Sequence, residues 1–359
     1  MGLLTPLMVK QEYTAADLTL EAKAGKSLMV WDIRIVNPVA NWATVKIANT
    51  TVGYFRCGGN LGNHLGLGKG SASHTHSVIL GTEVAAAADK TYPVTDAFGV
   101  AALVDYGAIT GMAGTKAGFV QLSDVAHPAY ETILAFLRRK GIFEGYPIGE
   151  GQTLTISGVN QAGCLQQVIY SEFDAGDILP SMANGSEADE YLLLNYGRVA
   201  AAITTSVDTI FGTTQTPAEF PNFPYSKDVP AKTEIDLIGI LASDIVDDRG
   251  GTDDMSSSFI KLIRQRETLF DEDKNGLFMR GIIGTTDAAA IIGKGISMLG
   301  NYSDKDNRPP LLFDPRLVFV AGEGLGLYLT TVAGAGRAAS TLAAADTEIC
   351  LIEKIRKVA

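Results

Sequence analysis

Two stretches of the chain share one pattern of apolar and polar positions, and both open with Gly-Glu-Gly, at Gly149 and at Gly322. The alternating apolar residues are Leu154 and Ile156 in the first stretch and Leu327 and Leu329 in the second. Alternation with a period of two is typical of β-strands. A turn of small residues and a second apolar run follow each time, at 165–172 and 348–354. The pattern therefore predicts the same β-hairpin twice, with Leu154 equivalent to Leu327 and Ile156 to Leu329.

The front part of each half carries a matching pair of strands. Residues 26–36 and 232–241 are both rich in alternating apolar positions, and on the first strand this alternation puts Met29, Trp31, Ile33 and Ile35 on one face. A second strand follows each of them, over residues 43–56 and 259–270. Each half therefore consists of two strands, a long variable middle and two more strands. This order predicts two similar β domains in tandem, each large enough to hold its own core.

We place an N-terminal arm at residues 1–19, the first domain at 20–180 and the second at 181–359. The acidic stretch 174–190 contains Pro180 and Gly185 and is predicted to link the domains. Residues 132–140 suit either a strand or a short helix, whereas residues 286–299 favour a helix. The glycine-rich segment 58–70 and the long insertions at 71–130 and 277–310 are predicted to be surface loops, because insertions between strands usually carry surface function.

Composition narrows the functional classes. Apolar residues make up 46% of the 359-residue chain and charged residues 19%, which is ample material for two cores. The formal net charge of −11 argues against binding exposed nucleic acid over a large surface, because the phosphates would be repelled. The N-terminus lacks the features of a signal peptide, and no apolar run is long enough to predict a membrane span. The cysteines Cys57, Cys164 and Cys350 have no metal-binding spacing and are predicted to be buried apolar residues.

One candidate metal site contains two histidines on one strand. His74 and His76 are followed by Glu83, which resembles the first metal-binding motif of cupins. In that family the glutamate comes three or four residues after the second histidine, whereas Glu83 comes later, and the chain shows no second motif. Surface histidines are the alternative interpretation.

A second candidate resembles the first half of a calcium-binding loop. Asp271, Asp273 and Asn275 offer oxygen ligands at alternating positions, and Gly276 suits the turn. Ile282 stands where such a loop needs its bidentate glutamate. We therefore interpret this segment as an acidic turn or a weak calcium site, and we predict no catalytic residue and no cofactor.

The order of strands and insertions resembles the double jelly-roll major capsid proteins of icosahedral viruses, the adenovirus and tectivirus type. The resemblance covers roughly residues 20–359 and concerns architecture, without a signature motif. It implies a mostly β protein of two tandem jelly-roll sandwiches, with short helices in the insertions. It also implies a homotrimer that forms a pseudo-hexagonal capsomer, contacts neighbouring capsomers and other capsid proteins in the virion, and is assembled in the host cytoplasm. The alternatives are a two-domain cupin-type metal-dependent enzyme and a sugar-binding or surface-layer β protein.

The C-terminus concentrates positive charge on an otherwise acidic chain. Lys354, Arg356 and Lys357 lie within four residues. If the last strand ends near Lys354, these cations protrude, and in a capsid they would face an internal membrane or the genome. A solvated chain end is the alternative.

Overall fold

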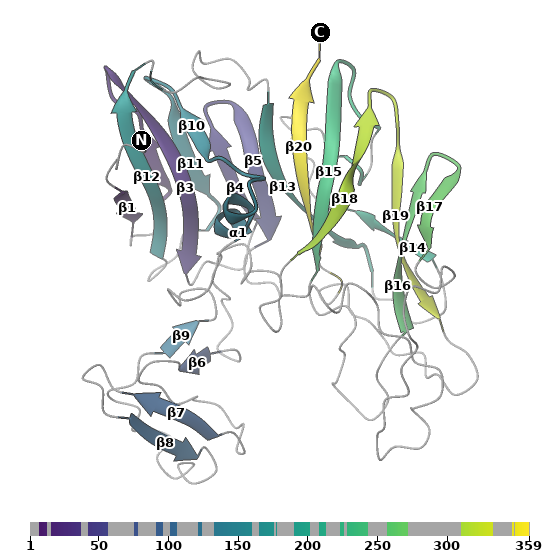
Figure 1. The fold of residues 1–359 in the computed structure, drawn as a ribbon, viewed down its shortest axis with the longest axis horizontal. Coiled ribbons are helices and arrows are strands. Elements are labelled where there is room, and N and C mark those ends of the chain that lie inside the picture. Colours follow the sequence, from purple (N-terminus) through teal and green to yellow (C-terminus); the bar gives the residue numbers. More distant parts are fainter. Residues whose placement is uncertain are drawn as a thin grey trace.

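In the computed structural model of the chain, the described residues are 7–12, 16–36, 42–56, 75–77, 91–95, 101–105, 121–123, 133–159, 165–175, 177, 190–201, 208–212, 223–225, 228–242, 257–271, 310–332, 347 and 349–358. Among them the protein is mostly β-sheet with a single α-helix (Figure 1). The prediction of a mostly β protein is therefore confirmed.

Within the described residues, the first half contains eight strands that share two sheets, and between the fifth and sixth of them lie four short strands and the helix. The eight are β1 (Met8–Glu12), β2 (Leu18–Glu21), β3 (Lys26–Val36), β4 (Trp42–Ile47), β5 (Thr50–Arg56), β10 (Tyr146–Ile148), β11 (Thr153–Ser157) and β12 (Leu165–Asp174). The intervening elements are β6 (Thr75–Ser77), β7 (Thr91–Thr95), β8 (Ala101–Asp105), β9 (Gln121–Ser123) and α1 (Ile133–Arg139).

The described part of the second half also contains eight strands. They are β13 (Glu190–Val199), β14 (Asp208–Gly212), β15 (Thr233–Ala242), β16 (Ser257–Arg264), β17 (Glu267–Asp271), β18 (Leu311–Val320), β19 (Leu325–Val332) and β20 (Ile349–Lys357).

The two halves repeat the same antiparallel pairing. One set of strands follows the order first, eighth, third, sixth, which is β1-β12-β3-β10 in the first half and β13-β20-β15-β18 in the second. The other set follows the order second, seventh, fourth, fifth, which is β2-β11-β4-β5 and β14-β19-β16-β17. The internal repeat predicted from the sequence is therefore present in the strand order.

The repeat extends to the irregularities of the strands. The pairing of β3 with β12 skips Trp31, and the pairing of β15 with β20 skips Ile238, which is the equivalent position of its strand. In the same way β4 pairs with β5 across a bulge at Val52, and β16 pairs with β17 across a bulge at Leu269. Such bulges bend and twist a strand locally, so both halves bend the same strands at the same places.

The bulge on β3 corrects the predicted face of that strand. One extra residue shifts the alternation, so the buried positions change from even to odd numbers along the strand. The buried apolar residues are Leu28 and Val30 before the bulge and Ile33 and Ile35 after it. Met29 and Trp31, which were predicted to share the inner face, are only partly buried.

Each of the two strands predicted at 43–56 and 259–270 is a tight hairpin in the structure. The first turns at Ala48 and Asn49 between β4 and β5, and the second at Gln265 and Arg266 between β16 and β17. Ala48 has a φ of 49° and Gln265 a φ of 52°, which are left-handed conformations that favour glycine. Neither turn carries the Gly or Asn-Gly signal of a hairpin, so the sequence did not reveal them.

The two predicted Gly-Glu-Gly hairpins are also corrected. The strands β11 and β12 follow one another in the chain but do not pair with each other, because β11 pairs with β2 and β4 and β12 pairs with β1 and β3. In the same way β19 pairs with β14 and β16, whereas β20 pairs with β13 and β15. Gly151 and Gly322 are equivalent, because both have a positive φ and both hydrogen-bond to the matching segment of their half. The true register is thus shifted by two residues, and Leu154 corresponds to Leu325 instead of Leu327. A shift of two keeps the same face, so all three leucines are buried.

The predicted arm at residues 1–19 contains β1, which pairs with β12, and the start of β2. Its sequence showed no alternation because all but the last residue of β1 are exposed. Residues 133–139 form the helix α1, which settles the ambiguity at 132–140. The domain boundary at 180/181, the segment 58–70, the predicted helix 286–299 and most of the long insertions lie outside the described residues.

Candidate functional site

The two halves meet along one pair of strands, β5 of the first half and β13 of the second. These strands run parallel, with Leu194 opposite Gly53 and Asn195 opposite Tyr54. The hydroxyl of Tyr146, on β10, donates a hydrogen bond to a β13 carbonyl oxygen, that of Leu192, at 3.2 Å. All of these residues are buried, so this seam is part of the core. Its apolar side chains join the halves into one packed unit.

A cleft of about 360 Å³ opens beside this seam. The first half lines it with Met29 and the segment from Gly141 to Pro147, and the second half adds Glu190, Arg316 and Lys354. Charged side chains of the second half therefore line a cleft to which the first half also contributes.

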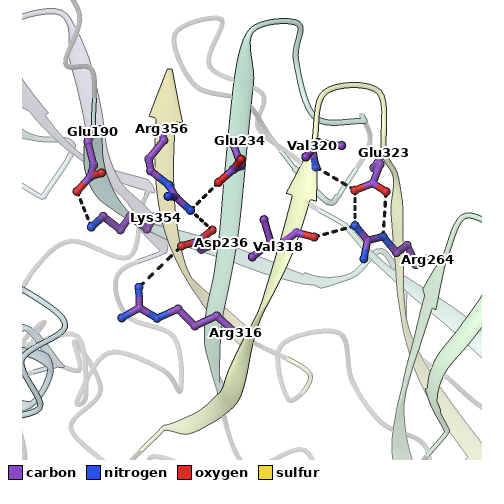
Figure 2. A network of polar contacts seen from close by, with 10 residues as sticks. All are labelled: Glu190, Glu234, Asp236, Arg264, Arg316, Val318, Val320, Glu323, Lys354 and Arg356. Carbon is purple, nitrogen blue, oxygen red and sulfur yellow. Dashed lines mark hydrogen bonds and ion pairs between the residues drawn. The ribbon is translucent and has the colours of Figure 1, made fainter. Parts of the chain in front are cut away.

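Ion pairs link the strands on this side of the second half (Figure 2). Glu190 of β13 pairs with Lys354 of β20. Arg356 of β20 pairs with Glu234 at 2.6 Å and with Asp236 at 2.5 Å, both on β15, while Arg316 of β18 lies 3.8 Å from Asp236. The four strands β13, β20, β15 and β18 are thus cross-linked by charge as well as by their backbone ladder. Such a network is worth more than isolated surface pairs, because Arg356 and Asp236 each have two partners of opposite charge.

A second charged contact closes the turn before β19. Arg264 pairs with Glu323 and donates a further hydrogen bond to the carbonyl oxygen of Val318 at 2.7 Å. Glu323 also accepts the backbone N–H of Val320 at 2.9 Å. The hydrogen bond from Arg264 holds the pKa of Glu323 below its usual range, and the Val320 N–H adds to this effect against partial burial.

A buried polar cluster lies behind the seam. Glu353 and Asn195 are both fully buried, and the Asn195 amide donates to Glu353 at 3.3 Å and to the carbonyl oxygen of Phe223 at 2.9 Å. The Tyr225 hydroxyl donates to the backbone oxygen of Asn195 at 3.0 Å. Its ring lies over Gly197, where a Cβ atom would come within 2.3 Å of the ring. The cluster therefore fixes the loop carrying Phe223 and Tyr225 against β13.

Burial of Glu353 favours its neutral form. Burial raises its pKa well above the usual range, and the single hydrogen bond from Asn195 offsets this only in part. Among the described residues, one oxygen of Glu353 and the side-chain oxygen of Asn195 have no hydrogen-bond partner.

The predicted cationic tail is integrated into the sheet. The strand β20 continues through Lys357, so the premise that it ends near Lys354 is wrong. Lys354 and Arg356 point to carboxylates of neighbouring strands and not away from the protein. The buried residues Leu351 and Ile352, which precede the basic residues, anchor the same strand in the core.

The predicted metal ligands are only partly described. Asp271 is a buried residue at the end of β17, whereas His74, Asp273 and Asn275 lie outside the described residues. His76 lies on the short strand β6, paired with Leu122 of β9. In the part of the chain that the structure describes, no three His, Cys, Asp or Glu side chains lie together as a metal site.

The cysteine prediction is confirmed for Cys350. Its thiol is buried, and burial raises the pKa of that thiol above its ordinary value. Cys57 and Cys164 lie outside the described residues.

No family model, curated protein or solved structure matches this chain. Within the described ranges, no helix is long and apolar enough to cross a membrane.

Sequence reasoning missed the residues that form the seam and the buried cluster. Asn195 and Glu353 each interrupt a run of large apolar residues, and that interruption was the available signal. A polar side chain inside such a run must find a partner, because a buried polar group without one is costly. Tyr146 offered no comparable signal, since its partner is a backbone oxygen of the other half.

Proposed function

We propose that this chain is the major capsid protein of an icosahedral virus, a non-enzymatic coat protein built from two tandem jelly rolls. The observation that carries the proposal is the strand order, which occurs twice in one chain. In each half, eight described strands form two antiparallel sets, ordered first-eighth-third-sixth and second-seventh-fourth-fifth, and this order suits a jelly roll. The matching bulges and turns support a duplication of one such unit.

The seam supports a wall-like block as the functional form. The two halves stand side by side, and the strand directions of both lie broadly across the line that joins them (Figure 1). Parallel pairing of β5 with β13 and the buried contact of Tyr146 with Leu192 fix the halves together. In a homotrimer, two such halves per chain would supply the six similar wedges of a pseudo-hexagonal capsomer. Neighbouring capsomers and other capsid proteins of the virion are then the partners.

The size of the purified protein in solution tests the proposal. We expect light scattering and negative-stain microscopy to show trimers with a pseudo-hexagonal outline, and closed shells under conditions that favour assembly. Metal analysis of the same sample separates this function from a cupin-type enzyme, which would hold about one divalent ion per intact site. A monomer that retains stoichiometric metal would overturn the capsid proposal, and a monomer that binds glycans would favour the sugar-binding alternative.

A further inference from the structure

The strand β1 and the residue before it expose apolar side chains whose equivalents in the second half are buried. The last strand of each half shows which residues are equivalent. Ile169 of β12 and Ile352 of β20 both lie directly beside the bulge that the two halves share. Ile169 pairs with Val9, and Ile352 pairs with Leu194. Val9 is therefore the equivalent of Leu194. Leu7, Met8 and Val9 are 66%, 39% and 49% exposed, whereas Leu192, Leu193 and Leu194 are 6%, 0% and 4% exposed.

The seam covers one edge of β13. The strand β13 has β20 on one side and β5 of the first half on the other, with Leu194 opposite Gly53. In the described part of the chain, β1 pairs only with β12 and its other edge pairs with no strand. An exposed edge with apolar side chains is a template for pairing with another strand.

The complementary edge lies on β17. The shared hairpin and bulge make β17 the equivalent of β5, with Phe270 in the place of Gly53 and Asp271 in the place of Tyr54. Within the described ranges, β17 pairs only with β16. In Figure 1, β1 and β17 lie at opposite ends of the row of strands. One chain therefore presents the two strand edges of such a seam at two separate places.

An apolar groove of about 220 Å³ adjoins β17. Leu269 and Phe270 of β17 line it together with Leu312, Phe313 and Leu317 of β18. Leu317 is the equivalent of Tyr146, because the two pair with Leu237 and Val30, which hold the same position of their strands. Tyr146 is the residue that contacts β13 at the seam, so the groove lies where a strand equivalent to β13 would dock.

We propose that β1 of one copy of this chain pairs in parallel with β17 of a second copy, which repeats between chains the seam that joins the halves within a chain. The register carries over, so Val9 lies opposite Phe270 and Lys10 lies opposite Asp271. Val9 thus lies beside Phe270, which lines the groove. This inference rests on the proposed function and adds to it the strands that join the subunits.

The contact is heterologous, because two different edges meet. Repetition of such a contact closes a ring when the rotation between copies allows it and otherwise gives an open filament. The rotation required is the one already present between the two halves, since the same strands would meet in the same register.

Cysteine cross-linking tests the register directly. Paired strands bring opposing Cα atoms to about 5 Å, within reach of a disulfide. We expect a mixture of the Val9→Cys and Phe270→Cys variants to form a disulfide-linked dimer under mild oxidation, and neither variant alone to do so. Replacing Val9→Cys by Ile210→Cys, at a site that is also 49% exposed, is the matched control and should give no dimer. An equal yield from the control mixture, or none from the test mixture, would overturn the proposal.

Sedimentation velocity on the full chain provides the second measurement. Val9→Asp should weaken self-association at least about tenfold, whereas Ile210→Asp should leave it unchanged. Because both residues are exposed, neither change should affect folding, which circular dichroism checks. If trimers and shells form and Val9→Asp does not weaken them, the strand assignment fails while the capsid function stands. If cross-linked rings or filaments form but never shells, the strand assignment stands and the capsid function fails.

Discussion

Gln152 and Glu323 hold the same position in the two halves of the chain and perform the same task. Each side-chain oxygen accepts the backbone N–H of the residue three positions earlier, Gly149 and Val320 respectively, at 2.9 Å in both cases. Gln152 is buried, whereas Glu323 is partly exposed and also pairs with Arg264. The repeat therefore preserves a turn-closing hydrogen bond while the chemistry of the acceptor has changed from an amide to a carboxylate.

This equivalence predicts which substitutions at the two positions destabilise the fold most. Gln152→Ala and Glu323→Ala should each lower the free energy of unfolding by about 1–2 kcal/mol, because a backbone N–H loses its acceptor. Glu323→Gln keeps an acceptor and removes only a partly exposed ion pair, so it should cost less, about 0–1 kcal/mol. Urea unfolding at pH 7 measures all three. A Glu323→Gln variant as unstable as Glu323→Ala would show that the charge, and not the turn, is what matters.

The buried acid Glu353 predicts a stability that falls as the pH rises. Its pKa is raised in the folded protein, so between the ordinary glutamate pKa and that raised value the folded state keeps a proton that the unfolded state releases. Stability from this group is complete below the ordinary pKa and declines above it, by up to about 1.4 kcal/mol per pH unit. Glu353→Gln keeps the shape and can pair with the Asn195 amide.

We therefore expect Glu353→Gln to be more stable than the wild type at pH 7 and close to it at pH 4. Unfolding curves from pH 4 to pH 8 measure the difference. The variant Glu172→Gln, at a partly exposed residue of β12, is the control for loss of one carboxylate. A difference between wild type and Glu353→Gln that does not change with pH would contradict a neutral Glu353.

Gly25 and Lys232 form another equivalent pair, and they predict opposite responses to mutation. Each precedes the third strand of its half, with φ of 75° and 58°, and the backbone oxygen of each accepts an N–H from the end of the last strand. A left-handed conformation costs a residue with a side chain roughly 1–2 kcal/mol, whereas glycine adopts it freely but loses more entropy on folding.

Lys232→Gly should therefore raise the free energy of unfolding by a few tenths to about 1 kcal/mol, and Gly25→Ala should lower it by about 1 kcal/mol. A Cβ atom at Gly25 would meet no other atom within 4 Å, so the loss would come from backbone conformation alone. Urea unfolding of both variants checks the signs. A destabilised Lys232→Gly would mean that the lysine side chain contributes more than its backbone costs.

The repeat was predictable from the sequence because alternation marks buried strands even when the exact register is wrong. The Gly-Glu-Gly match was two residues out of register, yet it identified the right strands, because a shift by two keeps the same side chains inside. The hairpin turns at Ala48 and Gln265 could not be predicted, since these residues adopt a conformation that sequence rules reserve for glycine. The strand β1 was missed for a different reason. Its side chains are exposed, so burial imposes no pattern on them.

The site was less predictable than the fold. The sequence predicts candidate site residues from their type and spacing, such as the aspartate run that begins at Asp271 or the basic C-terminus. The seam instead depends on backbone pairing of β5 with β13, which are separated by more than 130 residues in the chain, and on a tyrosine that binds a backbone oxygen. Long-range pairing of this kind leaves no local signal. Only the lone polar residue in each apolar run, Asn195 and Glu353, pointed to the buried cluster.

The C-terminal cations give the last prediction, which concerns an internal membrane or the genome. Lys354 and Arg356 already pair with Glu190, Glu234 and Asp236 on neighbouring strands, so most of their charge is balanced within the sheet. A free basic residue near an anionic membrane contributes about 1 kcal/mol of binding free energy.

We expect the replacement of Lys354, Arg356 and Lys357 by glutamine to change binding to anionic liposomes and to nucleic acid only slightly. The change should be no larger than in a control that neutralises the exposed Lys23, Lys140 and Lys232. Both variants lose three charges, so their comparison across a salt series removes the effect of net charge. A selective, salt-dependent loss of binding in the tail variant would instead identify the end of β20 as the contact with membrane or genome.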